Sequence, residues 1–255
     1  MNMKKLMVFA ILLLVVAAPS FAQSARRQTA QEFASDFQTV PVMGNTFGAN
    51  GSTFLTFVAV LNPTSSAFPI EVSLYDTMGT KHDATITLAA RELKTYNNFL
   101  AEVFNFNGGG AVTFKSAEST GGTHNNRFII SAQVQTGGTR YNTPVPALEF
   151  PGTSSPSFAA GVTVDTNTRT NVGCFNQSAV ANTVKVTVLD KTGTQTVGTT
   201  QLSLPANAWG QTGIASVVSN GYVRFEPSEA AVCYASVVEN ATNDARLAMG
   251  VEYTP

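Results

Sequence analysis

Apolar and polar residues alternate along short stretches of this chain. Between Ile70 and Leu74 every second residue is apolar, and a period of two predicts a half-buried β-strand. Asp76 and Gly79 then occupy the first and fourth positions of a short polar segment, which is typical of a type I turn leading into a hairpin. Strand-like runs of this kind, separated by turn residues about every ten positions, predict an all-β fold of antiparallel sandwiches.

The same pattern occurs twice, at a constant distance along the chain. Residues 58–62 and 70–80 match residues 172–176 and 184–194 without a gap, and their apolar, Asn, Asp and Gly positions coincide. An ungapped match of this length indicates an internal duplication. We therefore expect two β-sandwich domains in tandem. A parallel α/β fold is not expected, because the sequence lacks alternating strand and helix patterns.

Changes in composition set the expected domain limits. Residues 1–22 are mostly apolar, and residues 23–39 form a polar leader or linker. The first sandwich is expected at residues 40–150. Residues 151–157 are rich in Pro, Gly and Ser and are expected to link it to the second sandwich at residues 158–255.

Helical spacing of apolar residues occurs in only two places. Leu100, Val103 and Phe104 have i, i+3, i+4 spacing, and residues 214–218 repeat it at the same offset. This spacing places three apolar side chains on one face of a helix. We expect one short helical turn in each domain, covering one end of the sandwich.

Two asparagines lie at matching ends of predicted strands. Asn62 precedes Pro63, and Asn176 occupies the corresponding position of the second copy. Asn side chains often bond to nearby backbone groups in turns. We expect both residues to have this structural role.

The first residues predict export. Lys4 and Lys5 precede an apolar run that ends at Ala18, and small residues stand at positions 20 and 22. This order is typical of a secretory signal peptide cleaved after Ala22. An uncleaved N-terminal helix is the alternative, although the apolar run is short for a membrane span. The mature chain is expected in the periplasm, outside the cell or on its surface, without a membrane span.

Charge and composition exclude several kinds of partner. Without the two lysines of the signal peptide, 13 basic residues remain against 16 acidic ones, a formal charge of −3. Only 12% of all residues are charged, so nucleic acid and anionic membranes are not expected partners. An apolar content of 44% is sufficient for packed cores.

The two cysteines, Cys174 and Cys233, both lie in the second copy. We align them with Val60 and Ile129 of the first copy, and apolar residues at both positions indicate a buried site. In an oxidising compartment a disulfide is the preferred interpretation. Two free buried thiols are the alternative. Because the strand around Cys233 is apolar at nearly every position, a period of two does not show that its side chain faces Cys174.

No catalytic or metal-binding pattern is present in the sequence. The two histidines, His82 and His124, are predicted to lie in exposed segments, and no Gly-x-Ser-x-Gly elbow occurs. The segment from Asp165 to Thr168 offers one carboxylate, which makes a weak calcium site, and an Asx turn is the preferred interpretation. We expect no catalytic residues, no cofactor and no metal.

The aromatic residues are the candidates for a glycan-binding platform. Trp209 is the single tryptophan, and a place in the core or at a domain junction is preferred for it over stacking on a sugar. Tyr96, Tyr141 and Tyr234 are the other candidates for a polar aromatic patch. Tyrosine is also common in strands, so these residues alone do not define a site.

Several segments resemble a β-sandwich module of secreted bacterial proteins. In the first copy they are Val40-Pro41-Val42, Gly48 to Phe54 and Leu61-Asn62-Pro63; in the second they are Arg169 to Gly173 and Tyr234 to Asp244. The resemblance extends over nearly the whole mature chain. It implies tandem Ig-like modules that are exported, and it supplies no catalytic residues.

Taken with the duplication, this resemblance predicts the class of function. We expect an exported, non-catalytic structural or adhesive protein that interacts with an unknown protein or glycan at the cell surface. A carbohydrate-binding accessory protein is the alternative. That alternative requires several exposed aromatic side chains on one face of a sheet.

Overall fold

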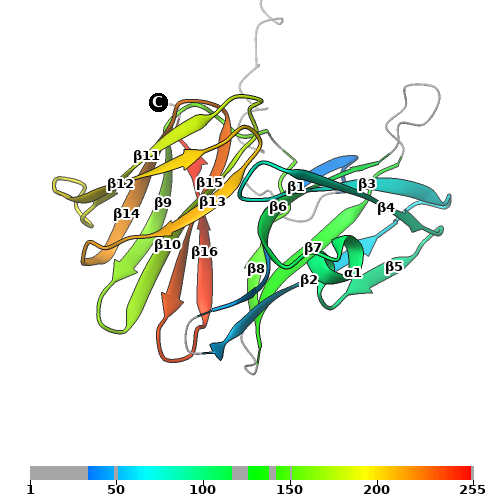
Figure 1. The fold of residues 1–255 in the computed structure, drawn as a ribbon, viewed down its shortest axis with the longest axis horizontal. Helices are drawn as coiled ribbons and strands as arrows, with labels where there is room; N and C mark the ends of the chain where they lie inside the picture. Colours follow the sequence, from blue (N-terminus) through cyan, green and yellow to red (C-terminus); the bar gives the residue numbers. More distant parts are fainter. Residues whose placement is uncertain (1–33, 49–50, 117–125, 138–141, 150, 254–255) are drawn as a thin grey trace, which may run out of the picture. The chain divides into compact units, whose positions relative to one another are not determined.

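The computed structural model describes residues 34–48, 51–116, 126–137, 142–149 and 151–253. Over these residues the protein is nearly all β, with antiparallel strand pairing and one short helix (Figure 1). This confirms the predicted all-β fold class. None of the helices in the described ranges is long and apolar enough to cross a membrane.

The first half of the chain, residues 34–149, contains one eight-stranded sheet in the order β4-β3-β6-β1-β2-β7-β8, with β5 paired to β2. Strand β1 pairs with β6 along most of its length and with β2 at its end, and its register shifts between Val40 and Met43. A bulge of this kind bends a strand. The strands are β1 (Phe37–Phe47), β2 (Thr53–Leu61), β3 (Phe68–Tyr75), β4 (Lys81–Leu88), β5 (Leu93–Tyr96), β6 (Gly108–Ser116), β7 (Ile129–Thr136) and β8 (Asn142–Val145).

The alternation read from the sequence places the core of the first half. Ile70, Val72 and Leu74 of β3 are fully buried, as expected for one face of a strand. They form one cluster with Val60 of β2 and Phe114 of β6. The cluster contains residues from both ends of the sheet order, so the sheet packs against itself as the two layers of a sandwich do.

The second half, residues 151–253, contains two sheets, ordered β12-β11-β14-β9-β17 and β13-β10-β15-β16. Val172 of the second sheet and Val186 of the first belong to the same buried cluster, so the sheets pack face to face. The strands are β9 (Ser157–Val164), β10 (Thr168–Asn176), β11 (Asn182–Leu189), β12 (Thr196–Leu204), β13 (Trp209–Gly213), β14 (Val218–Pro227), β15 (Ala231–Glu239), β16 (Ala245–Met249) and β17 (Val251–Glu252).

The two asparagines predicted to bond to turns make matching contacts. Asn62 and Asn176 are both fully buried. Each side-chain nitrogen donates to two backbone carbonyl groups, at 2.7–2.8 Å. Each side-chain oxygen accepts a backbone N–H two residues later, from Thr64 at 2.8 Å and from Ser178 at 3.0 Å. The predicted structural role is confirmed, and the equivalence agrees with the predicted duplication.

The helix of the first half, α1 (Phe99–Phe104), is confirmed and has well-defined caps. The Asn98 side chain accepts from the Ala101 N–H at 3.3 Å, and Glu102 Oε1 accepts from the Asn98 N–H at 2.7 Å. This is a reciprocal capping arrangement. Asn105 ends the helix in the left-handed conformation, with φ of 51°.

The helical turn predicted at residues 214–218 was wrong. Strand β13 extends up to this segment, and the Ile214 N–H donates to the Thr170 carbonyl at 2.9 Å. Ser216 stands where the first copy has Glu102, so the acidic side chain that completes the capping arrangement is missing. Apolar spacing alone does not form a helix against competing strand pairing.

The disulfide joins Cys174 to Cys233, as predicted. The two residues are direct partners in the β10–β15 ladder, with Cα atoms 4.1 Å apart. Both belong to the buried cluster of the second half. The alignment with Ile129 was wrong by one residue, since Val60 pairs with Ile130 in the structure. Ile129 and Ile130 are both apolar, so periodicity did not fix which of them faces the core.

The domain limits drawn from composition differ in detail from the strand boundaries. Strand β1 begins at Phe37, inside the segment 23–39 that was assigned as a leader. The segment 151–157 is paired with the second half, because Thr153 and Ala231 exchange two backbone hydrogen bonds of 3.1 Å. The predicted signal peptide lies outside the described residues, as do His124 and Tyr141. Cleavage after Ala22 and independent folding of two domains stay predictions.

Candidate ligand-binding cleft

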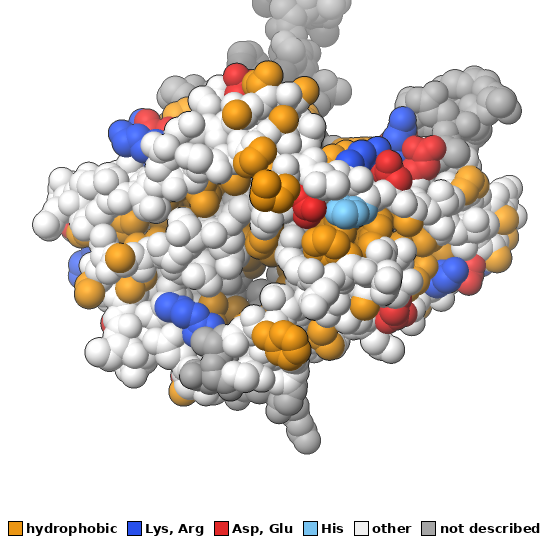
Figure 2. All heavy atoms as spheres, viewed as in Figure 1, with side chains coloured by type: hydrophobic (Ala, Val, Ile, Leu, Met, Phe, Trp, Pro, Cys, Tyr) orange, Lys and Arg blue, Asp and Glu red, His pale blue; other side chains and the backbone are white. Residues whose placement is uncertain are grey.

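A cleft of about 320 Å³ lies between the two halves of the chain. One wall is a face of the sheet β13-β10-β15-β16, and the other is made by residues of β1, β2, β6, β7 and β8. Apolar side chains line most of it, and a volume above about 300 Å³ is sufficient for a small ligand or one unit of a polymer. Charged side chains are sparse over the face of the molecule shown in Figure 2.

Strand alternation decides which residues of the second half reach the cleft. The side chains of Val172 and Cys174 on β10 point into the core, so positions 171 and 173 lie on the opposite face of the strand. On β15, Ser236 is the direct partner of Asn171 and lies on the same face. The side chains of Asn171 and Ser236 are therefore neighbours on one surface of the sheet.

Tyr234 lies flat on this surface over Gly173. A Cβ atom at position 173 would lie 2.9 Å from Tyr234 Cε1 and closer still to the hydroxyl oxygen. The hydroxyl group donates to Gln211 Oε1 at 2.9 Å. Burial raises the pKa of Tyr234 strongly, while the nearby Trp209 indole acts in the opposite direction. The residue is therefore a neutral hydrogen-bond donor at physiological pH.

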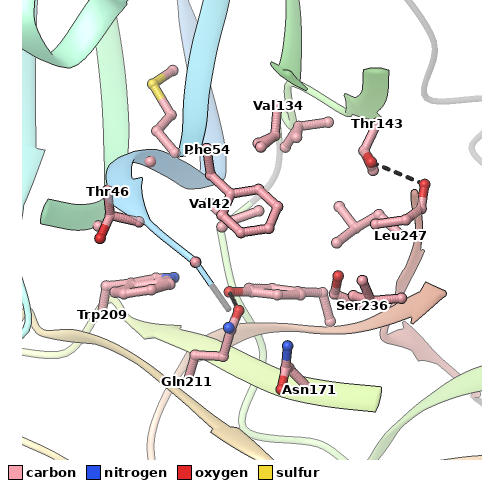
Figure 3. A pocket seen from close by; sticks show the side chains of 18 of the residues that line it. Val42, Thr46, Phe54, Val134, Thr143, Asn171, Trp209, Gln211, Ser236 and Leu247 are labelled. Atoms are coloured by element: carbon pink, nitrogen blue, oxygen red, sulfur yellow. Dashed lines mark hydrogen bonds between the residues drawn. The ribbon is translucent and has the colours of Figure 1, made fainter. Parts of the chain in front are cut away.

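Aromatic rings form the apolar part of the cleft. Phe54 of the first half and Trp209 of the second half both line it, and Figure 3 shows their rings around the same cavity as Asn171 and Gln211. The Trp209 ring packs closely against the backbone of Gly109, where a Cβ atom would lie 2.8 Å from its Cζ3 atom. Trp209 is therefore at the junction of the two halves, as the sequence analysis preferred, and also borders the cleft.

Contacts on one side of the cleft join its two walls through the Asp76 turn. The Trp209 N–H donates to the Asp76 carbonyl at 3.0 Å. The rings of Tyr75 and Phe175 lie 5.1 Å apart. The hairpin turn predicted from the sequence is thus part of the junction.

A second set of contacts joins the walls where β8 approaches β16. Thr143 Oγ1 donates to the Ala245 carbonyl at 2.9 Å. Thr136 Oγ1 donates to the Asn243 carbonyl at 3.3 Å. Leu247 packs against the core cluster of the first half. The cleft is therefore held between two separate groups of contacts.

Arg169 is the one side chain among the described residues lining the cleft that carries a charge at neutral pH. Its Nη1 and Nη2 atoms donate to the side-chain oxygens of Asn240, at 3.0 Å, and Asn243, at 2.7 Å. Within the described ranges no carboxylate forms an ion pair with it. Burial lowers the pKa of Arg169, yet a guanidinium stays charged at neutral pH. Among the described residues, the positive charge in the cleft therefore has no acidic partner.

Hydrogen-bonding groups in the cleft remain available to a ligand. Asn171 and Ser236 make no side-chain hydrogen bond to any described residue, and neither is fully buried. Gln211 uses its oxygen to accept from Tyr234, which leaves its amide nitrogen free to donate. These groups lie beside the aromatic rings (Figure 3). Such a surface offers donors, acceptors and apolar area together.

His82, the histidine that lies within the described residues, contacts the Asp76 turn and Phe106. His82 Nε2 lies 3.2 Å from Asp76 Oδ2, and its ring lies 5.2 Å from that of Phe106. Burial raises the pKa of Asp76, but hydrogen bonds from His82 and from the backbone of Thr80 and Met78 outweigh it, so the net shift is downward. Within the described part of the chain, no hydroxyl or thiol nucleophile is bonded to His82.

The candidate calcium segment forms a turn. Asp165 Oδ1 accepts the backbone N–H groups of Asn167 and Thr168, both at 2.8 Å. This is the Asx turn that was the preferred interpretation. Among the described residues, no group of three or more His, Cys, Asp or Glu side chains is placed to hold a metal ion.

Of the three tyrosines considered as a possible aromatic patch, the two that the structure describes do not share a surface. Tyr96 is buried in the first core, in edge-to-face contact with Phe99, and Tyr234 is also buried, in the second half beside the cleft. Sequence analysis missed Asn171, Gln211 and Ser236 as site residues. Polar residues between the buried positions of β10 were the available signal, but alternation does not reveal what an outer face contacts.

No model of a known protein family matches this chain, and no curated protein matches it in sequence. The predicted relation to tandem Ig-like modules therefore stays a proposal. The function has to be argued from the cleft itself.

Proposed function

We propose that the protein is an exported, non-catalytic surface-interaction protein built of two Ig-like modules, and that it binds its partner through the cleft. The observation that carries this proposal is the composition of the cleft. It combines aromatic rings from both halves with the available Asn171 amide, Gln211 amide nitrogen and Ser236 hydroxyl.

Binding is a better use of these groups than catalysis. General acid–base or nucleophilic chemistry needs a titratable group near neutrality or an activated nucleophile within hydrogen-bond reach of a base. The described lining offers amides, hydroxyls and the Arg169 guanidinium. These groups recognise and orient a ligand, but none of them exchanges a proton readily at neutral pH.

Carbohydrate binding is the second candidate, and one observation favours it. The Trp209 and Phe54 rings adjoin the amides of Asn171 and Gln211 (Figure 3). Rings that contact apolar C–H groups, next to amides that bind hydroxyls, suit a saccharide. The site is a cleft rather than the set of exposed aromatic side chains on one sheet face that the sequence analysis required for this alternative.

Retention on cell envelopes tests the main proposal. The full chain is expressed with its N-terminal segment, and the exported product is labelled and mixed with isolated envelopes of the producing cells. We expect an N-terminus at Gln23 and saturable retention that unlabelled protein displaces. Asn171→Ala combined with Gln211→Ala is expected to reduce retention at least about tenfold, because two ligand hydrogen bonds are lost.

Gln201→Ala is the matched control, since Gln201 is an exposed amide on β12 and does not line the cleft. It should leave retention unchanged. Retention that does not saturate, or that survives loss of both cleft amides, would contradict the proposal.

A further inference from the structure

We propose that the cleft binds an acidic saccharide unit, with its ring against Trp209 and Phe54 and its carboxylate on Arg169. This inference rests on the proposed function, because both use the same cleft, and it adds the chemical class of the ligand. The ring, hydroxyl and carboxylate of such a unit each have a counterpart among the residues described above.

The charge of the ligand follows from Arg169. Its guanidinium lines the cleft, is partly buried, and donates only to two neutral amide oxygens. A guanidinium has five N–H groups, so three remain for a ligand. No carboxylate is present among the described lining residues, so nothing in that set would repel an anion. A planar carboxylate is the group that an arginine binds most directly.

Arg169 is also fixed in place before any ligand arrives. Asn240 and Asn243, at the turn between β15 and β16, each hold one of its nitrogen atoms. Long side chains lose rotational freedom when they bind. A guanidinium that is already positioned loses less, so it contributes more to affinity.

The remaining groups suit the ring and hydroxyls of a sugar. Asn171 and Gln211 provide amides, and Ser236 provides a hydroxyl, on one wall of the cleft. Phe54 provides apolar surface on the other wall, and Trp209 of β13 adds an aromatic ring to the same wall as the amides (Figure 3). A pyranose has apolar C–H faces and a polar edge. Its faces can therefore contact the aromatic rings while its hydroxyl groups bond to the amides and to Ser236.

An extended peptide fits this cleft less well. Peptides that add to a sheet bind at an edge, where backbone N–H and C=O groups are unpaired. The polar wall is instead the face of β10 and β15, and both strands are paired on each side, β10 with β13 and β15, and β15 with β10 and β16. Along β10 and β15, therefore, only side chains are offered to the ligand.

A glycan array tests the inference. The probes are oligosaccharides containing uronic acids, each paired with its carboxyl-reduced neutral counterpart of the same linkage and length, together with an oligoglutamate peptide. We expect at least one uronate oligosaccharide to bind about tenfold or more tightly than its reduced counterpart. Arg169→Gln should abolish that preference while leaving affinity for the neutral member unchanged. Asn171→Ala should weaken binding of both members.

Arg224→Gln is the charge-matched control, because Arg224 pairs with Glu226 on β14 and does not line the cleft. Melting temperatures of all variants are measured to establish that they are folded. Equal binding of acidic and reduced members, an Arg169→Gln variant that keeps the preference, preferential binding of oligoglutamate, or no binding to any probe would overturn the inference. If the glycan array gives one of these results but the wild-type protein is still retained saturably on envelopes, only the acidic-saccharide inference is contradicted, and the proposed function stands.

Discussion

Tyr234 lies over the backbone of Gly173, and no side chain larger than hydrogen fits beneath its ring. Gly173→Ala should displace the ring and break the hydrogen bond to Gln211. We expect a loss of about 1–3 kcal/mol in the free energy of unfolding, the usual cost of overpacking, and weaker ligand binding. Urea unfolding measures the first effect.

Gly44→Ala is the control for this variant. A Cβ atom at position 44 would make its nearest contact at 3.7 Å, which is ordinary van der Waals distance. Equal loss of stability in the two alanine variants would show that the Tyr234 contact is unimportant.

The disulfide between Cys174 and Cys233 should stabilise the second half. It closes a loop with a sequence separation of 59, and its removal by Cys174→Ala with Cys233→Ala is expected to lower stability by about 2–4 kcal/mol. Part of this loss comes from the smaller side chains, because both positions lie in the core. Alkylation followed by mass spectrometry should find no free thiol in the purified protein before reduction.

Asn62 and Asn176 provide a paired test of the duplication. Asn62→Ala and Asn176→Ala each remove two hydrogen bonds from a buried side-chain amide to backbone carbonyl groups. Each variant should lose about 1–3 kcal/mol, since each intramolecular hydrogen bond contributes roughly 0.5–1.5 kcal/mol. If the positions are equivalent, the two losses will agree within about 0.5 kcal/mol. A negligible effect of one and a large effect of the other would contradict equivalence.

Asp76 should make the junction sensitive to acid. Its pKa is lowered in the folded protein, so the carboxylate contributes stability above its ordinary pKa of about 4 and loses that contribution as the pH falls through the folded value. Asp76→Asn removes this titration. The variant should be less stable than the wild type at neutral pH and should lose less stability between roughly pH 5 and pH 2. Melting curves at several pH values measure this, and parallel pH profiles would contradict it.

Local patterns in the sequence were sufficient for most of the strands. Alternation placed Ile70, Val72 and Leu74 on the buried face of β3, and the paired positions of Cys174 and Cys233 indicated their bond. Where both faces of a strand are apolar, as at Ile129 and Ile130, alternation of apolar and polar residues does not decide the register of the strand. The second helical turn failed for a different reason, because strand pairing at Ile214 competes with apolar spacing.

The cleft was not predictable in the same way. Its polar groups lie on the outer face of β10 and β15, and alternation identifies that face without saying what covers it. The approach of Trp209 to Gly109 and the hydrogen bond between Trp209 and Asp76 depend on residues distant in sequence. From the sequence alone, Arg169 and Asn171 are therefore not distinguished from ordinary surface residues. Only the contact between the two halves shows that they line a cleft.

The division of the cleft between two halves of the chain has a thermodynamic consequence. A ligand that touches both Phe54 and Asn171 binds only molecules in which both halves are folded and in contact. By mass action, such a ligand raises the melting temperature of both halves together. Should the unliganded protein melt in two steps, saturation of the cleft would bring those steps toward a single cooperative transition.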